Sequence, residues 1–332
     1  MELLIAYLLI PLILALGLSK LVIYWFGRRL LDIPNDRSSH TIPTPRGGGI
    51  AIVLATVLSL LITELSGMPQ PPTLLYLIAP GLLMAAVGIA DDLFTLNIRI
   101  RLIIQLAVAC TITGVILHNT THPILIAATL GAISILGIVW LTNLYNFMDG
   151  INGLAALQTV FVCGSMSLIF FLKAKHPETL LLMLTLSSAS LGFLYWNFPR
   201  AKLFMGDAGS LFIGITLATL MVWTAYNDMT TACIWLIILT SFIVDASYTL
   251  LTRLTTGQKF YLPHRSHFYQ KIAQKLNSHT KATLLIMCFN LAWLLPLAIA
   301  TQLDKINEFA ALILAYIPAL YGAHKIKAGK AE

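Results

Sequence analysis

The chain has 332 residues, of which 58% are apolar and only 11% are charged, and its mean hydropathy is +0.84. Charged residues make up about a quarter of a typical soluble domain, so this composition excludes a soluble protein and indicates an integral membrane protein. The formal net charge of +7 suits anionic headgroups and phosphorylated substrates. No segment outside the predicted membrane spans is long enough for a nucleic-acid-binding module, so we expect no nucleic-acid partner.

Apolar runs of roughly 17 to 25 residues, the length that crosses a bilayer as a helix, follow one another along the chain. The first run opens with Glu2 and has no small-residue cleavage site, which predicts a retained helix and not a signal peptide. We predict an all-α polytopic membrane protein with about eleven transmembrane helices. They cover residues 3–26, 47–65, 73–90, 102–118, 123–141, 153–172, 179–196, 210–226, 232–251, 282–302 and 308–324.

The basic residues are divided unequally between the two sides that these spans define. Of the 21 Lys and Arg residues, only Lys173, Lys175 and Lys305 fall on one of the sides. Cytoplasmic loops carry an excess of Lys and Arg, so the pattern predicts an N-terminus outside and a C-terminus in the cytoplasm. The inner connections are also longer and more polar than the outer ones. Because loops carry sites while spans supply the scaffold, we expect an active site in the inner-face loops, residues 27–46, 91–101, 142–152, 197–209 and 252–281.

The last of these loops contains a helical pattern. Phe268, Ile272 and Leu276 recur every four residues, while Lys271 and Lys275 occupy other faces. This spacing predicts a short amphipathic helix that lies on the membrane surface.

Two adjacent carboxylates, Asp91 and Asp92, close the third predicted span. Such a pair at a membrane surface is repulsive unless a cation or a proton lies between the two groups, so it indicates a binding site. The alternative is that both residues only cap the helix and face water.

Asp207 lies between Gly206 and the Ala208–Ser210 segment, directly before an apolar span. Free N–H groups at the amino end of a helix favour phosphate, and a carboxylate beside phosphate indicates Mg²⁺. The alternative is a simple aspartate N-cap.

Polar side chains recur every three residues at Asn143, Asn146, Asp149 and Asn152. A helical turn would place them along one edge, where they would suit a hydroxylated ligand or a hydrated cation. The alternative is that they only end a span.

Basic groups occur in two inner loops. His264, Arg265 and His267 form a cluster that suits phosphate. Arg46, followed by three glycines, allows a close approach of the backbone to a ligand, although it fits a flexible helix start equally well. Asp245 lies inside the ninth span; an intramembrane carboxylate is a functional candidate, but we favour a buried structural hydrogen-bonding group.

The order and spacing of these motifs resemble the polyprenyl-phosphate N-acetylhexosamine-1-phosphate transferases, the superfamily of WecA and MraY. The resemblance runs from about residue 32 to 270. The segments Asp32 to His40 and Thr44 to Gly49 look most like the WbpL-like branch, which starts O-antigen or other surface polysaccharide chains. The motifs are Asp91-Asp92, Asn146-Phe-Met-Asp149-Gly, Asn197-Phe-Pro, Phe204-Met-Gly-Asp207-Ala-Gly-Ser210 and the histidine-containing last loop.

The resemblance implies a Mg²⁺-dependent glycosyl-1-phosphate transferase of the bacterial inner (cytoplasmic) membrane, with one transmembrane catalytic domain over residues 1–332. Its partners would be undecaprenyl phosphate and a UDP-N-acetylhexosamine, and its products undecaprenyl-diphosphate-sugar and UMP. The reaction would initiate O-antigen or other surface polysaccharide synthesis, with Mn²⁺ as the alternative metal. The oligomeric state is left open, a homodimer included.

The resemblance also implies roles for individual residues. Asp91, Asp92, Asp149, His264 and His267 would be catalytic. Asp207 and Asp92 would bind the metal. The substrate-binding residues would be Arg46, Asn146, Asn152, Asn197 and Arg265.

Two departures from the family pattern limit this transfer of roles. The family often has Asp-Gly-x-Asp-Gly where this chain has Asn152 as the fourth residue, so a carboxylate role does not carry over. Arg265 and Ser266 interrupt the run of histidines, which leaves open which imidazole does what. The sugar, whether GlcNAc, FucNAc, QuiNAc or another, is also open.

A competing interpretation from another class is a cation-coupled transporter, for which many spans and the intramembrane Asp245 would be natural. Against it, nearly all other acidic groups lie at the predicted inner surface.

Overall fold

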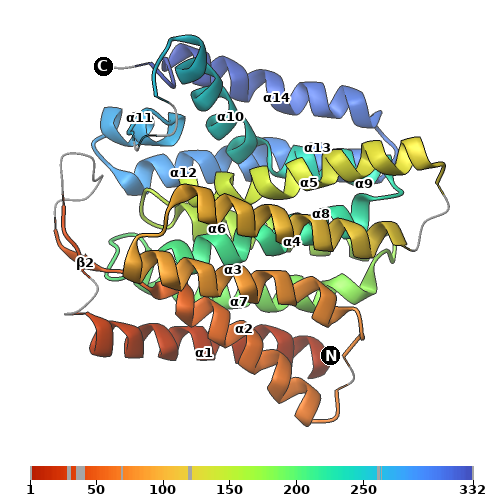
Figure 1. The fold of residues 1–332 in the computed structure, drawn as a ribbon, viewed down its shortest axis with the longest axis horizontal. Helices are drawn as coiled ribbons and strands as arrows, with labels where there is room; N and C mark the ends of the chain where they lie inside the picture. The colour runs from red at the N-terminus through yellow and green to blue at the C-terminus, as the bar shows by residue number, and fades with distance from the viewer. Residues whose placement is uncertain are drawn as a thin grey trace.

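The protein is described by a computed structural model that covers residues 2–27, 31–34, 42–68, 70–118, 122–259, 262 and 264–330. Most of its helices lie side by side in one bundle (Figure 1), which confirms the predicted all-α membrane fold. The two ends of the chain lie at opposite ends of this bundle (Figure 1), and the short helix α11 and strand β2 lie at the same end as the C-terminus.

Each predicted span corresponds to a helical segment. The first eight are α1 Glu2–Phe26, α2 Gly48–Leu65, α3 Leu74–Phe94, α4 Ile98–His118, α5 Ile124–Phe147, α6 Leu154–Leu172, α7 Pro177–Asn197 and α8 Asp207–Ala225. The remaining helical segments are α9 Met229–Ile238, α10 Thr240–Thr255, α11 Phe268–Lys275, α12 His279–Phe289, the π-helical turn η1 Asn290–Leu294, α13 Leu295–Gln302 and α14 Glu308–Lys325.

The described residues contain nine helices that are long and apolar enough to cross a membrane, or ten if the bent pair α9 and α10 forms one span. The eleventh predicted span is α14, which is helical but does not meet this test. Its 18 residues begin with Glu308 and end with His324 and Lys325, so its polar ends leave a shorter apolar stretch than the other spans have.

The ninth predicted span is not one continuous helix, which corrects the sequence-based expectation. α9 and α10 meet at Leu239 with a bend of 73°. The hydroxyl of Thr240 donates to the carbonyl of Leu236 at 2.9 Å, and such bonds from a side chain to the preceding turn often accompany bends in helices. The bend directs α10 towards α14 and α11, with which it packs.

α8 is the most enclosed of the candidate spans, since 83% of its apolar window is buried. It packs against α2, α3, α5 and α9. The approach to α2 is so close that a Cβ atom on Gly49 would lie 2.2 Å from the Cα of Gly209. Gly49, in the first turn of α2, therefore allows close contact with α8.

The segment before α2 is fixed by the backbone. Strands β1 Leu31–Asp32 and β2 Thr44–Pro45 pair in antiparallel fashion. The amide of Gly48 then donates to the carbonyl of Phe204 and that of Gly49 to Met205, both at 2.8 Å. This segment is therefore anchored beside the amino end of α8. Residues 35–40 of the branch motif lie outside the described part of the chain.

We predict that Gly49→Ala lowers the unfolding temperature in detergent. The added methyl group has no room against Gly209, and overpacking of this kind costs about 1–3 kcal/mol. Gly114→Ala in α4 is the matched control, because nothing lies within 4 Å of its Cβ position; it should be neutral or slightly stabilising. Equal unfolding temperatures for the two variants would contradict the close α2–α8 packing.

Candidate active site

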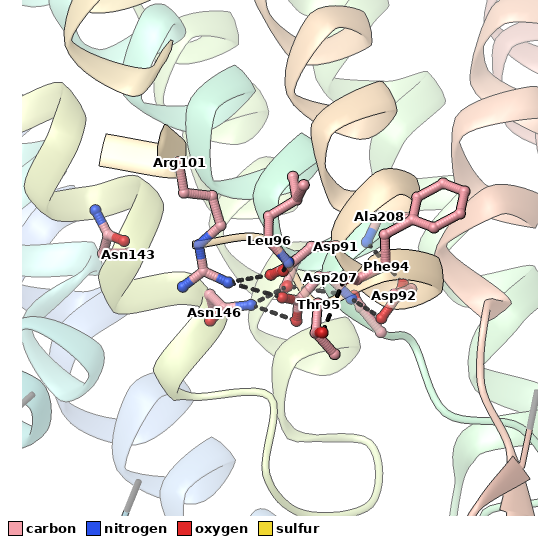
Figure 2. Close-up of polar contacts among 12 residues, drawn as sticks. Asp91, Asp92, Phe94, Thr95, Leu96, Arg101, Asn143, Asn146, Asp207 and Ala208 are labelled. Atoms are coloured by element: carbon pink, nitrogen blue, oxygen red, sulfur yellow. Dashed lines mark hydrogen bonds and ion pairs between the residues drawn. The ribbon is translucent and has the colours of Figure 1, made fainter. Parts of the chain in front are cut away.

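Carboxylates from distant parts of the chain meet at one end of the bundle. Asp91 and Asp92 belong to the last turn of α3, which continues to Phe94, and Asp207 is the first residue of α8. Figure 2 shows these three side chains together with Arg101 of α4 and Asn146 of α5. The structure thus brings together three of the aspartates that the sequence motifs singled out.

Arg101 lies at the centre of the cluster, although no sequence pattern distinguished it from the other inner-face cations. Its Nη1 donates to Asp91 Oδ2 and, at 3.0 Å, to Asp207 Oδ2. Asp91 Oδ1 also accepts the amide of Leu96 at 2.6 Å. One guanidinium nitrogen therefore bridges two carboxylates. Their two negative charges repel each other, and the cation between them offsets this repulsion.

Asp92 is directed to a different partner from its neighbour Asp91. Its two carboxylate oxygens accept the amides of Asp207 and Ala208, each at 3.3 Å. Asp92 therefore caps α8 from another helix, where the helix dipole favours a negative charge. We expected the free amides at the start of α8 to bind phosphate, but these two amides are bonded to Asp92. Asp207 is also not the N-cap of α8, because Gly206 holds that position.

Asn146 joins α5 to this centre. Its side-chain amide donates to Asp207 Oδ1 at 2.8 Å and to Ser210 Oγ at 2.9 Å. Asn143, one turn earlier, instead pairs with Gln105 at 2.7 Å. α5 ends at Phe147, so Asp149 and Asn152 do not continue one helical edge, and that part of the expected alignment is wrong.

Asp149 follows α5 and lies close to the other carboxylates. Burial raises its pKa well above the usual range of an aspartate, and the negative charges of Asp207 and Asp92 raise it further. The backbone amide of Gly206 and the charge of Arg46 oppose these effects without outweighing them.

Arg46 approaches the same cluster from the segment before α2. It forms an ion pair with Asp32 at 2.7 Å. Burial lowers the pKa of Arg46, but Asp32, Asp92 and Asp207 outweigh this and hold it above the usual value. This guanidinium is half-exposed, so it is available to an anionic ligand.

Two predicted substrate-binding amides are engaged by the protein itself. Asn197 is buried; it donates to the carbonyl of Leu203 and accepts the amide of Gly153, both at 2.8 Å. Asn152 donates to the carbonyl of Pro199 at 3.1 Å and bonds His279 at 3.2 Å. Their geometry favours shaping of the loops around the site over direct contact with a ligand.

The predicted short helix is confirmed as α11 Phe268–Lys275, which directly follows the histidine cluster and has His267 as its N-cap. Its place on the membrane surface stays a prediction. The hydroxyl of Tyr269 donates to the carbonyl of Phe147 at 3.0 Å, which fixes α11 to the end of α5. Asp245 is buried and accepts the amides of Phe268 and Tyr269, both at 2.8 Å. This confirms the interpretation of Asp245 as a buried hydrogen-bonding group.

Arg265, between the two histidines, has a buried Nε atom that finds no hydrogen-bond partner among the described residues. A buried donor that lacks an acceptor carries a desolvation cost, which an anionic ligand would remove. This unsatisfied donor suits phosphate at the histidine cluster.

The donor set also fits a divalent cation. No group of three His, Cys, Asp or Glu side chains converges in the described part of the chain. However, Asp91 and Asp207 both reach one nitrogen of Arg101, so two carboxylates are directed to one point. Mg²⁺ is commonly bound by one or two carboxylates together with substrate phosphates, and this arrangement suits that mode.

Comparison with known proteins finds a family to which part of this chain is similar. The model of glycosyl transferase family 4 matches residues 74–225, which run from the start of α3 to the end of α8 and contain the Asp91, Arg101 and Asp207 centre. Arg46 and the histidine cluster lie outside the matched segment.

Three relatives with related names span most of the chain. A Bacillus subtilis protein named "Probable undecaprenyl-phosphate N-acetylglucosaminyl 1-phosphate transferase" is 31% identical over 77% of this chain and 73% of its own. Two further relatives share the name "Undecaprenyl-phosphate alpha-N-acetylglucosaminyl 1-phosphate transferase". The protein from Thermotoga maritima is 28% identical to this chain over 82% of each chain. The protein from Yersinia pestis is 26% identical over 90% of this chain and 84% of its own.

The fold and the site thus define a multi-span helical membrane enzyme of the transferase class. The chain belongs to glycosyl transferase family 4, in the superfamily that the sequence motifs indicated. It is a bacterial membrane protein, for which the inner membrane is the expected location.

We predict that Arg101→Gln lowers the unfolding free energy of the ligand-free protein by about 1–2 kcal/mol, because Asp91 and Asp207 lose their shared cation. The loss should stay below the about 3–5 kcal/mol of a fully buried pair, since solvent reaches these groups. Arg99→Gln, two residues earlier on α4 and exposed, is the control and should unfold like the parent in thermal melts. A neutral Arg101→Gln would contradict the bridging role.

Proposed function

We propose that the protein transfers a sugar 1-phosphate from a UDP-N-acetylhexosamine to undecaprenyl phosphate, giving undecaprenyl-diphosphate-sugar and UMP. The reaction would initiate O-antigen or another surface polysaccharide. The observation that carries the proposal is the Asp91–Arg101–Asp207 centre. The printed names of the relatives support the acceptor and the sugar-phosphate donor.

The layout suits two substrates of different solubility. The nucleotide sugar is soluble, whereas the acceptor phosphate is anchored at the membrane surface, so catalysis needs charged groups at that depth. An oxygen of the lipid phosphate attacks the phosphorus next to the sugar, the bond to the UMP phosphate breaks, and UMP leaves with the bridging oxygen. The attacking phosphate is already an anion at neutral pH, so positioning and charge neutralisation supply most of the catalysis. We favour this direct route over a covalent aspartyl-phosphate.

Asp207 is the principal candidate ligand for Mg²⁺, with Mn²⁺ as the alternative. Asp91 is the better placed second carboxylate, because it shares Arg101 with Asp207, whereas Asp92 bonds the amides of α8. The role of Asp92 as a metal ligand stays a prediction; its carboxylate oxygens keep lone pairs that a metal ion would use. When bound, Mg²⁺ would neutralise the diphosphate and stabilise the departing UMP.

The remaining residues divide into ligand-contacting and positioning groups. Arg46, Arg265, His264 and His267 would contact phosphate or sugar groups. Asn146 holds the carboxylate of Asp207, and Asn152 and Asn197 shape the loops beside it. With a metal ion held by the carboxylates, the guanidinium of Arg101 would be available to a substrate phosphate.

The transporter alternative loses its main support in the structure. Asp245, the intramembrane carboxylate that favoured it, is satisfied by the amino end of α11 and lies among neighbouring side chains. Membership of glycosyl transferase family 4 also favours an enzyme.

The proposal predicts UMP release by the purified protein from undecaprenyl phosphate and a panel of UDP-N-acetylhexosamines. Release should require Mg²⁺ or Mn²⁺ and should occur with one preferred donor, which would identify the sugar. Omission of the lipid acceptor is the control. A folded protein that releases no UMP with GlcNAc, FucNAc or QuiNAc donors would contradict this choice of donor and acceptor.

We further predict that Asp207→Asn lowers turnover by on the order of 1000-fold, in the range found when a group that stabilises the transition state is lost. The carboxamide keeps the size of the side chain, so the variant should stay folded in detergent. Asp304→Asn, at an exposed acidic residue paired with Lys173, is the control and should keep full turnover. Normal UMP release by Asp207→Asn would remove its metal-binding role.

A further inference from the structure

The two histidines of the last inner loop differ in the partner of Nδ1. Their rings stack with centroids 4.9 Å apart and an angle of 27° between the planes. His264 Nδ1 faces Ser266, whereas His267 Nδ1 faces Asp245. The proton of a neutral imidazole lies on one nitrogen only, and the bond made by the other nitrogen sets which one.

Nδ1 of His264 is an acceptor. The backbone amide of Ser266, which can only donate, lies 3.4 Å from it, and the Ser266 hydroxyl lies 3.0 Å away. Arg253 Nη1 donates to that hydroxyl oxygen at 3.3 Å, which leaves the hydroxyl hydrogen for His264. With Nδ1 unprotonated, the ring proton of His264 lies on Nε2.

The charge state of His264 agrees with this chain of donors. Burial lowers its pKa to about 3, and the positive charge of Arg253 contributes in the same direction. His264 is therefore neutral at physiological pH and offers one N–H group, at Nε2.

Nδ1 of His267 is a donor. It lies 3.1 Å from Asp245 Oδ1, which also accepts the amide of Phe268, while Oδ2 accepts the amide of Tyr269. Both oxygens of Asp245 thus already act as acceptors, as an ionised carboxylate does, so the proton between them and His267 belongs to Nδ1. When the ring of His267 is neutral, its lone pair therefore lies on Nε2, which makes no hydrogen bond within the described part of the chain.

We propose that Ser266 and Asp245 hold the two imidazoles in opposite tautomers, so that His264 donates from Nε2 to a phosphate oxygen of the nucleotide sugar and His267 accepts at Nε2 from one of its hydroxyl groups. The ligand assignment rests on the proposed function, whereas the tautomers do not. A lone pair cannot bind an anionic oxygen, so the phosphate falls to His264, and the sugar and ribose supply hydroxyl donors for His267. Asp245 and Ser266 are positioning residues in this arrangement.

The tautomers are measured directly by NMR of the full-length protein in detergent with ¹⁵N-labelled histidine. His264→Gln and His267→Gln assign the two sets of signals. In the parent we expect a protonated Nε2 on His264 and a protonated Nδ1 on His267. The same tautomer on both rings, or a doubly protonated His267 at neutral pH, would overturn the proposal.

Two variants test the cause of each tautomer. Asp245→Asn should change the signals of His267 and leave those of His264, whereas Ser266→Ala should do the reverse. Thr249→Val is the control for packing in α10, because the Thr249 hydroxyl also approaches Asp245, at 3.4 Å, without reaching His267. Unchanged His267 signals in a folded Asp245→Asn variant would remove Asp245 from the positioning role.

Kinetics test the ligand assignment separately. Asp245→Asn should lower kcat/KM by about 10–100-fold, the range for a lost partner that orients an imidazole, while Thr249→Val keeps the parent value. Opposite tautomers with no UMP release from any donor would contradict the proposed function and leave the tautomers standing. UMP release from a protein whose two imidazoles have the same tautomer would support the proposed function and contradict the tautomer assignment.

Discussion

The contact between the Asp92 carboxylate and the amino end of α8 is the constraint on which the rest of the site depends. It joins a charge at the end of one helix to the free amides of another, 115 residues later in the chain. α3 and α8 come close enough for this contact because Gly88 has no side chain: a Cβ there would lie 2.4 Å from the carbonyl oxygen of Asp207. With Asp92 in this position, the adjacent Asp91 and the first carboxylate of α8 both face Arg101.

Much of the fold could be predicted because the bilayer imposes a simple rule. A helix that crosses it must be apolar over a fixed length, and every run of that kind became a helical segment. The same rule does not determine where a span bends, so the break at Leu239 was invisible in an unbroken apolar run. Nor does it decide whether α14, with its charged last turn, lies deep enough to count as a span.

The sequence predicted several of the residues that form the site, but not the hydrogen bonds and ion pairs that they make. Asp91, Asp92 and Asp207 stood out because carboxylates are rare in this chain, and the structure brings them together. Arg101 was missed because basic residues are common on the inner face, so its sequence position alone carried no signal. The roles of Asn152 and Asn197 depend on which backbone groups lie opposite them, and that information exists only after α6, α7 and α12 have packed.

The enclosed position of α8 has a consequence for the order in which the protein assembles. Three of the helices that surround it, α2, α3 and α5, are synthesised before it. Asp91 and Arg101 can therefore meet early, whereas Asp92 has no partner amides until residues 207 and 208 leave the ribosome. The earlier helices must admit α8 between them, so the acidic centre is completed only after the helices α1 to α7 have been synthesised.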